Sequence, residues 1–118
     1  MVEIVATAEF AGWYQGLSEG DAEQVTLHVE ILQVRGVALA FPQSSSIKGS
    51  RIALRELRLQ SSGHPLRVFY AFDPKRQAVL LVGGDKAGNE KFYEEMIPLS
   101  ERLFAAFLKE TGQNKPKK

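Results

Sequence analysis

Four basic side chains stand within or directly after short apolar segments in the middle of this 118-residue chain. They are Arg55, Arg58, Arg67 and Lys86, and they are interspersed with apolar residues rather than confined to loops. A guanidinium group is planar, permanently charged and able to bind two phosphate oxygens at once, so it suits anchoring a phosphate and stabilising a transition state. These residue types therefore indicate a phosphate site held on a rigid sheet.

Arginine does not exchange its proton near neutral pH, so proton transfer at such a site would need other groups. The candidates in the sequence are Glu56, His64, Tyr70, Lys86 and Tyr93. His64 lies in the turn-like run SSGHP and is interpreted as an exposed loop residue. On residue types alone, arginines in strands are more often solvated or salt-bridged than functional, and Glu56 lies close to both Arg55 and Arg58.

Three apolar segments must position these groups. They cover residues 52–60, 66–72 and 78–82 and are joined by SSGHP and DPKR, a pattern that predicts an antiparallel meander. Side chains alternate along a strand, so Glu56 and Arg58 should share one face while Arg55 points to the other. In the next strand Tyr70 falls on the face opposite Arg67, together with apolar neighbours, and is interpreted as a core residue.

The glycine pair ahead of Lys86 resembles a nucleotide-binding loop only superficially. GGDKAG lacks the spacing of a P-loop, so Gly83 and Gly84 are interpreted as residues that end the strand, with Lys86 as a cation at its end.

The flanking regions predict helices around this sheet. A short strand over residues 2–7 leads into a helix capped near Thr7, and a second helix follows Ser18 and ends near Gly36. Their apolar stripes suit a helix pair on one face of the sheet. Residues 37–51 are interpreted as a surface loop. A last helix is predicted from an N-cap at Asn89, with Pro98 kinking it or splitting it at residue 97.

Composition narrows the class of protein. The chain has 44% hydrophobic residues and 25% charged ones, enough for one domain with a core. It has no cysteine and only two separated histidines, so no thiolate or zinc site is expected. No apolar run is long enough for a membrane span, and the N-terminus does not resemble a secretory signal. A cytoplasmic protein is expected.

The formal net charge of +1 hides an uneven distribution. Residues 1–34 hold six acidic and no basic residues, whereas residues 35–88 hold nine basic and three acidic ones. A basic centre indicates a face for an anion, most commonly a phosphate backbone. The alternative is intramolecular, with acidic helices laid beside a basic sheet.

An ordered set of short motifs resembles the RelE/HigB-like toxins of bacterial type II toxin–antitoxin systems, in particular their phage-derived group. The motifs are Lys48-Gly49-Ser50-Arg51, Leu54-Arg55-Glu56-Leu57-Arg58, the run from Arg67 to Pro74, Arg76, Ala78, Leu80-Leu81, Gly84-Asp85-Lys86, Phe92-Tyr93 and Ile97-Pro98. The resemblance implies an α+β fold, with two N-terminal helices packed on a small antiparallel sheet and a C-terminal helix. The toxin domain would cover residues 1–111, and residues 112–118 would form a disordered basic tail.

The resemblance also implies a function. Such a toxin is an mRNA endoribonuclease, ribosome-dependent or free, that inhibits translation without a metal or other cofactor and is silenced by a cognate antitoxin. Carried onto this chain, the catalytic set is Arg58, Arg67, Lys86, Tyr93 and Glu56, and the RNA-binding set is Lys48, Arg51, Arg55 and Arg76. Glu56 would be a base or an orienter of arginine, and Lys86 would add charge or join proton transfer.

One element departs from these relatives, which often carry Leu-Gly-Arg-Pro after the second helix, where this chain has Leu39-Ala40-Phe41-Pro42. One basic contact is therefore missing. The alternative function is a non-catalytic binder on the same fold, either a ParE-like gyrase poison or an inactive toxin that still binds antitoxin. A cleft that gathers Lys86, Arg67 and either a tyrosine or Glu56 would favour the nuclease over the binder.

Overall fold

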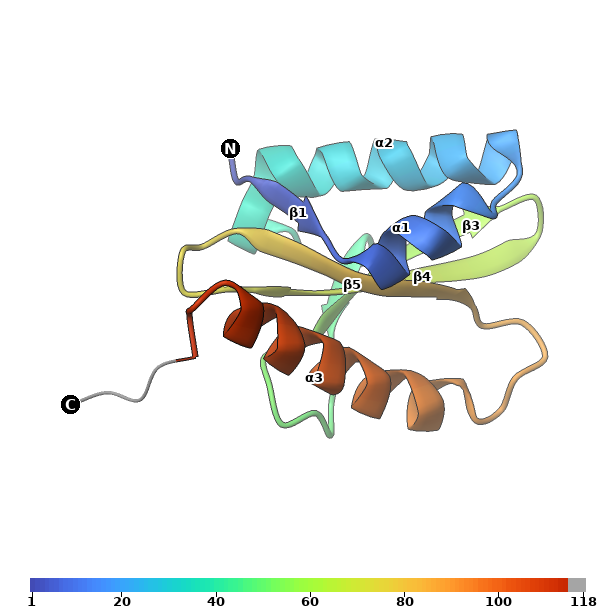
Figure 1. The fold of residues 1–118 in the computed structure, drawn as a ribbon. Coiled ribbons are helices and arrows are strands. Elements are labelled where there is room, and N and C mark those ends of the chain that lie inside the picture. The colour runs from blue at the N-terminus through green and yellow to red at the C-terminus, as the bar shows by residue number, and fades with distance from the viewer. Residues whose placement is uncertain (115–118) are drawn as a thin grey trace.

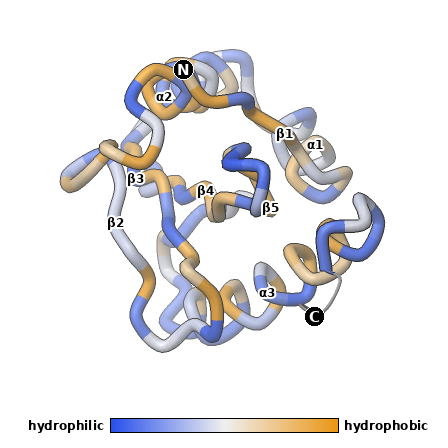
Figure 2. The backbone as a smooth tube through the Cα atoms, turned by 90° about the vertical axis from the view of Figure 1, so that its left-hand side faces the viewer, coloured by the Kyte–Doolittle hydropathy of each residue, from blue (hydrophilic) through white to orange (hydrophobic). Residues whose placement is uncertain are grey.

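The structure is a computed structural model that describes residues 1–114, and it forms one five-stranded sheet with helices on both sides (Figure 1). In chain order the elements are β1 (Ile4–Ala6), α1 (Ala8–Gln15), α2 (Glu19–Arg35), the 3-10 helix η1 (Gly36–Ala38), β2 (Ser44–Ser46), β3 (Arg55–Ser61), β4 (His64–Phe72), β5 (Ala78–Asp85) and α3 (Phe92–Glu110). The strand order is β1-β5-β4-β3-β2. Seen from the end of the sheet, α1 and α2 lie on one side and α3 on the other, which confirms the expected α+β class (Figure 2).

The meander predicted for the centre of the chain is present as β3, β4 and β5, all antiparallel. Ser62 and Gly63 connect β3 to β4 with φ angles of 51° and 81°, as a tight hairpin turn requires. His64 is exposed, as predicted, although it begins β4 rather than lying in a loop. At the far edge β1 pairs with β5 in parallel, so the sheet is mixed rather than wholly antiparallel as expected.

The two N-terminal helices begin at the predicted caps. The hydroxyl of Thr7 accepts a hydrogen bond from the backbone N–H of Phe10, and that of Ser18 accepts one from the N–H of Asp21. Both helices pack on the sheet face that carries Tyr70, which is fully buried as predicted. The core between them is formed by Phe10, Val25, Leu32, Leu39, Leu57, Leu59, Leu66, Val68, Tyr70, Ala78 and Leu80.

The N-cap predicted for α3 was wrong, and of the two alternatives predicted for Pro98 the split is excluded. The N-cap is Lys91, while the side chain of Asn89 accepts a hydrogen bond from the N–H of Lys91 within the preceding turn. Pro98 lies inside the helix and does not split it. A proline removes one hydrogen bond, and here residues before and after it, including Phe92 and Phe104, are anchored in the core on the second face of the sheet.

Gly83 and Gly84 do not end β5, which continues to Asp85. Their role is to admit aromatic rings from opposite sides. A Cβ atom on Gly83 would lie 2.2 Å from the ring of Trp13 on α1, and one on Gly84 would lie 2.8 Å from the ring of Phe92 on α3. The glycines therefore allow helices to approach both faces of the sheet closely.

The segment expected to be a surface loop contains regular structure. Residues 36–38 form η1, and β2 pairs with β3 so that Ser45 lies opposite Glu56. Ser44 is completely buried. Three consecutive serines carry neither apolar alternation nor β-branching, so the strand gave no signal in the sequence.

Across the described residues, no helix combines the length and apolar character that crossing a bilayer requires. In the predicted tail, the side-chain amide of Gln113 donates a hydrogen bond to Asp73 at 3.1 Å. Residues 115–118 of that tail lie outside the described part of the chain.

Candidate functional site

A buried carboxylate is the centre of the polar cluster on the α3 side of the sheet. Glu56 on β3 is only 3% exposed, and both of its oxygens accept hydrogen bonds. The hydroxyl of Tyr93, at the start of α3, donates to Oε1 at 2.8 Å, and the hydroxyl of Ser45 on β2 donates to Oε2 at 3.1 Å. Two other elements, α3 and β2, therefore contact this side chain of β3.

Two arginines on neighbouring strands share this carboxylate. Arg58 and Arg67 are directly opposite each other in the pairing of β3 with β4. The Nη1 atom of Arg58 lies 3.3 Å from Oε2 of Glu56, and the Nε atom of Arg67 lies 3.6 Å from Oε1. Arg67 is buried and also donates Nη1 to the carbonyl of Leu66, whereas the Arg58 side chain is about one third exposed. Arg67 is thus fixed in place, and Arg58 reaches toward solvent.

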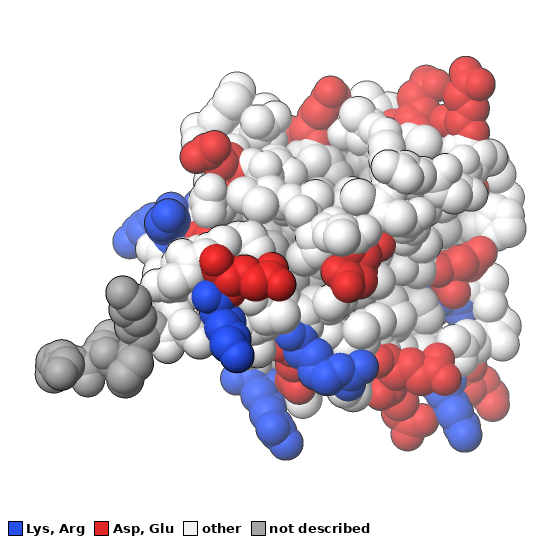
Figure 3. Space-filling view, in the orientation of Figure 1, with Lys and Arg blue, Asp and Glu red and all other residues white. Residues whose placement is uncertain are grey.

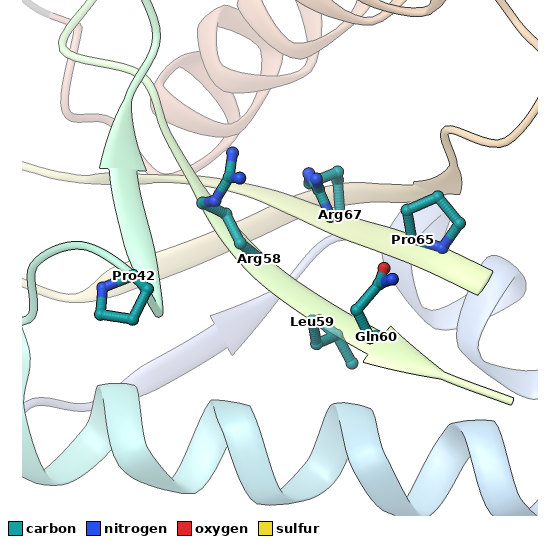
Figure 4. A pocket seen from close by; sticks show the side chains of 6 residues that line it. All are labelled: Pro42, Arg58, Leu59, Gln60, Pro65 and Arg67. Carbon is teal, nitrogen blue, oxygen red and sulfur yellow. The ribbon is translucent and has the colours of Figure 1, made fainter. Parts of the chain in front are cut away.

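The two arginines line an open pocket of about 430 Å³ (Figure 4). Its lining residues are Pro42, Arg58, Leu59, Gln60, Pro65 and Arg67. Alternation along β3 explains the arrangement, because Arg58 points to the α3 side while Leu59 points into the core beneath α2.

Lys86 completes the cluster from the end of β5. Its backbone N–H donates to the carbonyl of Pro65 at 3.0 Å, which places the residue beside the pocket. Its exposed ammonium group lies 5.6 Å from the centre of the Tyr93 ring, within the range of a cation–π contact. Lys86 is therefore linked to Glu56 through Tyr93.

Burial and the hydrogen bond to Glu56 raise the pKa of Tyr93 above its ordinary value, while the nearby Arg67 partly opposes the shift. A phenol that donates to a carboxylate in a partly buried site resists ionisation, because its anion would face a second negative charge. Tyr93 thus stays protonated at neutral pH and can donate a hydrogen bond or a proton.

The cluster has an excess of positive charge. Its three cations, Arg58, Arg67 and Lys86, outnumber its one carboxylate, Glu56, which only the two arginines approach. On the side shown in Figure 3, acidic side chains are spread from the top of the view to the lower right, and basic ones lie mostly in the lower half and at the left, several of them beside acidic ones. Among residues 1–114, no ion pair joins an acid of the first 34 residues to a base of the central segment. The acidic helices therefore do not neutralise the sheet by direct pairing.

Not all the predicted site residues meet here. The structure brings together Glu56, Arg58, Arg67, Lys86 and Tyr93, the complete catalytic set expected from the sequence. The residues expected to bind RNA lie elsewhere. The Nε atom of Arg55 donates to Ser44 on the opposite face, Arg76 lies exposed in the β4–β5 turn at the far end of β5, and Lys48 and Arg51 lie in the exposed β2–β3 connection.

Two residues beside the site were not anticipated. Ser45 reaches Glu56 because β2 forms an edge strand that the serine run does not reveal. Phe41 lies with its ring 5.4 Å from the guanidinium carbon of Arg58. For Phe41 the sequence offered one signal, an aromatic residue in a polar connecting segment in which no core position was predicted.

Comparison with known proteins identifies the family. Residues 12–105 match the family model described as "Phage derived protein Gp49-like (DUF891)". The chain is 37% identical over 111 residues to the Mycobacterium tuberculosis protein named "Putative toxin HigB2", a match that covers 92% of this chain and 55% of that protein. It is 33% identical over 101 residues to "Putative toxin HigB3" of the same organism, covering 84% of this chain and 87% of the relative. The expected resemblance is thereby confirmed, and the chain belongs to the Gp49-like family of phage-derived proteins as a HigB-like member.

Proposed function

We propose that this protein is the toxin of a toxin–antitoxin pair and that it inhibits translation in the cytoplasm by cleaving mRNA. The observation that supports cleavage most is the cluster of Glu56, Arg58, Arg67 and Tyr93, with Lys86 beside it, whose two arginines line one open pocket. A protein that only binds a partner does not need a proton donor and a buried carboxylate next to paired arginines.

The reaction we propose is attack of an RNA 2′-hydroxyl on the adjacent phosphorus, with loss of the hydroxyl proton to solvent water and departure of the 5′-oxygen of the next nucleotide, which leaves a 2′,3′-cyclic phosphate. Arg58 and Arg67 bind the phosphate and stabilise the negative charge that develops on its oxygens. Tyr93 carries its proton at neutral pH and lies next to Arg67 through the shared Glu56, so it is the group placed to donate a proton to the leaving oxygen.

Glu56 positions the other groups in this mechanism rather than acting as the base. Both of its oxygens already accept hydrogen bonds, from Tyr93 and Ser45, and each lies near an arginine. Lys86 is exposed at the edge of the pocket and adds a charge that attracts the RNA backbone. The partner that silences the toxin is an antitoxin, which we propose lays an acidic segment over this cationic surface.

The proposal is tested by inducing expression of the wild type, Arg67→Ala and Lys86→Ala and mapping mRNA 5′ ends in the cells. Arg76→Ala is the matched control, because this exposed arginine lies at the far end of β5. The wild type and the control should arrest growth and create new RNA ends, and the two site variants should not. Growth arrest with broken chromosomal DNA and no new RNA ends would instead identify a gyrase poison.

A further inference from the structure

An exposed aromatic ring lies beside the pocket and has no role in the chemistry described above. Phe41 is 70% exposed, although burying such a side chain is strongly favourable. The Arg58 guanidinium lies over the Phe41 ring, with its central carbon 5.4 Å from the ring centre. The next residue, Pro42, lines the pocket together with both arginines. The ring is therefore held at the pocket by a cation and remains open to solvent.

We propose that Phe41 is a stacking platform for a nucleobase of the bound RNA, a role that rests on the proposed function for its ligand. Proteins that bind single-stranded RNA combine cationic contacts to the backbone with aromatic rings on which bases stack. A nucleotide whose phosphate is bound by Arg58 carries its base into the region of the Phe41 ring. The stacked base would select single-stranded RNA and fix the bond that is cleaved.

The surroundings of Phe41 favour RNA over a protein partner. By contrast, the exposed apolar side chains of α2, namely Leu27, Ile31 and Val34, line a groove that is mostly apolar. Such a helix surface is typical of protein docking. Phe41 instead lies over a guanidinium at the edge of a pocket lined by two arginines. Arginine next to an aromatic ring is a common arrangement for holding a base and its phosphate.

Binding of a short single-stranded RNA made uncleavable by 2′-O-methyl groups tests this role without depending on catalysis. Fluorescence anisotropy at fixed salt would compare the wild type with Phe41→Leu, Phe41→Tyr and the control Val37→Ala, whose side chain is similarly exposed. We expect Phe41→Leu to weaken binding roughly 5- to 100-fold, the loss typical of one base–aromatic stack. Phe41→Tyr and Val37→Ala should bind the RNA with the affinity of the wild type. A probe that lacks bases should bind Phe41→Leu and the wild type with equal affinity.

The inference is overturned if the wild type does not bind the probe or if Phe41→Leu binds it equally well. Loss of antitoxin binding in Phe41→Leu with unchanged RNA binding would also overturn it, and would assign Phe41 to the protein interface. Cleavage of the unmodified RNA is measured separately. If Phe41→Leu weakens binding but the wild type does not cleave RNA, the stacking site is retained and the proposed nuclease is contradicted. If the wild type cleaves RNA but Phe41→Leu binds RNA as tightly as the wild type, the nuclease is retained and the stacking site is contradicted.

Discussion

The two faces of the β3–β4 hairpin carry nearly the same residue types and use them differently. On the α2 side, Arg55 donates to Ser44 at 3.1 Å, and both lie beside the hydroxyl of the fully buried Tyr70. On the α3 side, an arginine, a serine and a tyrosine also meet, but around the carboxylate of Glu56. The first cluster joins β2 to the core, whereas the second lies beside an open pocket.

The difference shows that residue type alone does not identify the site. The α2-side cluster holds no carboxylate and its tyrosine is sealed in the core, so its hydrogen bonds serve stability. The α3-side cluster instead holds two arginines and a tyrosine with a raised pKa around one buried carboxylate, with Lys86 beside them. What separates them is the alternation of side chains along β3, which places the carboxylate and the paired arginines on one face only.

The largest expected effect comes from removing the buried arginine of the α3-side cluster. Arg67→Ala should lower the rate of RNA cleavage roughly 100- to 1,000-fold, because it removes a fixed stabiliser of phosphate charge. It should also cost about 3 kcal/mol of unfolding free energy by leaving Glu56 buried next to one arginine. Adding Glu56→Gln should restore stability, measured by urea unfolding, without restoring cleavage; recovery of both would contradict the assigned role.

Exchanging the tyrosine of each cluster for phenylalanine should have opposite effects on cleavage. Tyr93→Phe should reduce cleavage at least about tenfold because it removes the proposed proton donor, and should lower the unfolding free energy by about 1–2 kcal/mol because the buried Glu56 loses a hydrogen bond. Tyr70→Phe should leave cleavage intact and lower the unfolding free energy by about 1 kcal/mol, since Ser44 loses a buried hydrogen-bond partner. Rates and thermal unfolding of both variants provide the comparison, which fails if Tyr70→Phe loses cleavage or if Tyr93→Phe keeps it.

The pH dependence of cleavage should report Tyr93. Its pKa is raised, so its proton is retained up to and beyond pH 10, and activity that depends on this proton should fall only at more alkaline pH. The residual activity of Tyr93→Phe should lack this decline. Rates measured across the alkaline range on one RNA substrate test this, and an identical decline in both proteins would remove Tyr93 from the mechanism.

A smaller effect is expected at the end of the sheet away from the pocket. Burial tends to raise the pKa of Asp73, but hydrogen bonds from Gln77 and Gln113 outweigh it and lower the pKa below the ordinary value. The stability from these bonds is therefore complete above about pH 4 and is lost as pH falls through the lowered pKa. In acid unfolding experiments, Asp73→Asn should reduce this dependence by less than about 1 kcal/mol without affecting cleavage at neutral pH.

Much of this organisation could be predicted from the sequence. The meander follows from three apolar segments separated by turns, and alternation correctly separated Arg55 from Arg58 and Tyr70 from Arg67. Helix caps at Thr7 and Ser18 were also local signals. These features depend on neighbouring residues, which is why a single sequence contains them.

The rest depends on contacts between distant segments. The serine strand β2 is defined by pairing with β3, and its Ser45 reaches Glu56 only through that pairing. The glycines of β5 are explained by the rings of Trp13 and Phe92, which come from other elements. Arg55 and Arg76 resembled Arg58 as cations, but their places in the fold separate them from the pocket. No local pattern contains such information.

The most direct measurement compares two arginines three residues apart on the same strand. Purified Arg55→Gln and Arg58→Gln would be incubated with one RNA below their melting temperatures, and the rate of formation of new 5′ ends would be recorded for each. If the α3 side of the sheet carries the chemistry, Arg58→Gln loses most of the cleavage and Arg55→Gln retains it. Equal rates in the two variants, or loss only in Arg55→Gln, would contradict this assignment of the active face.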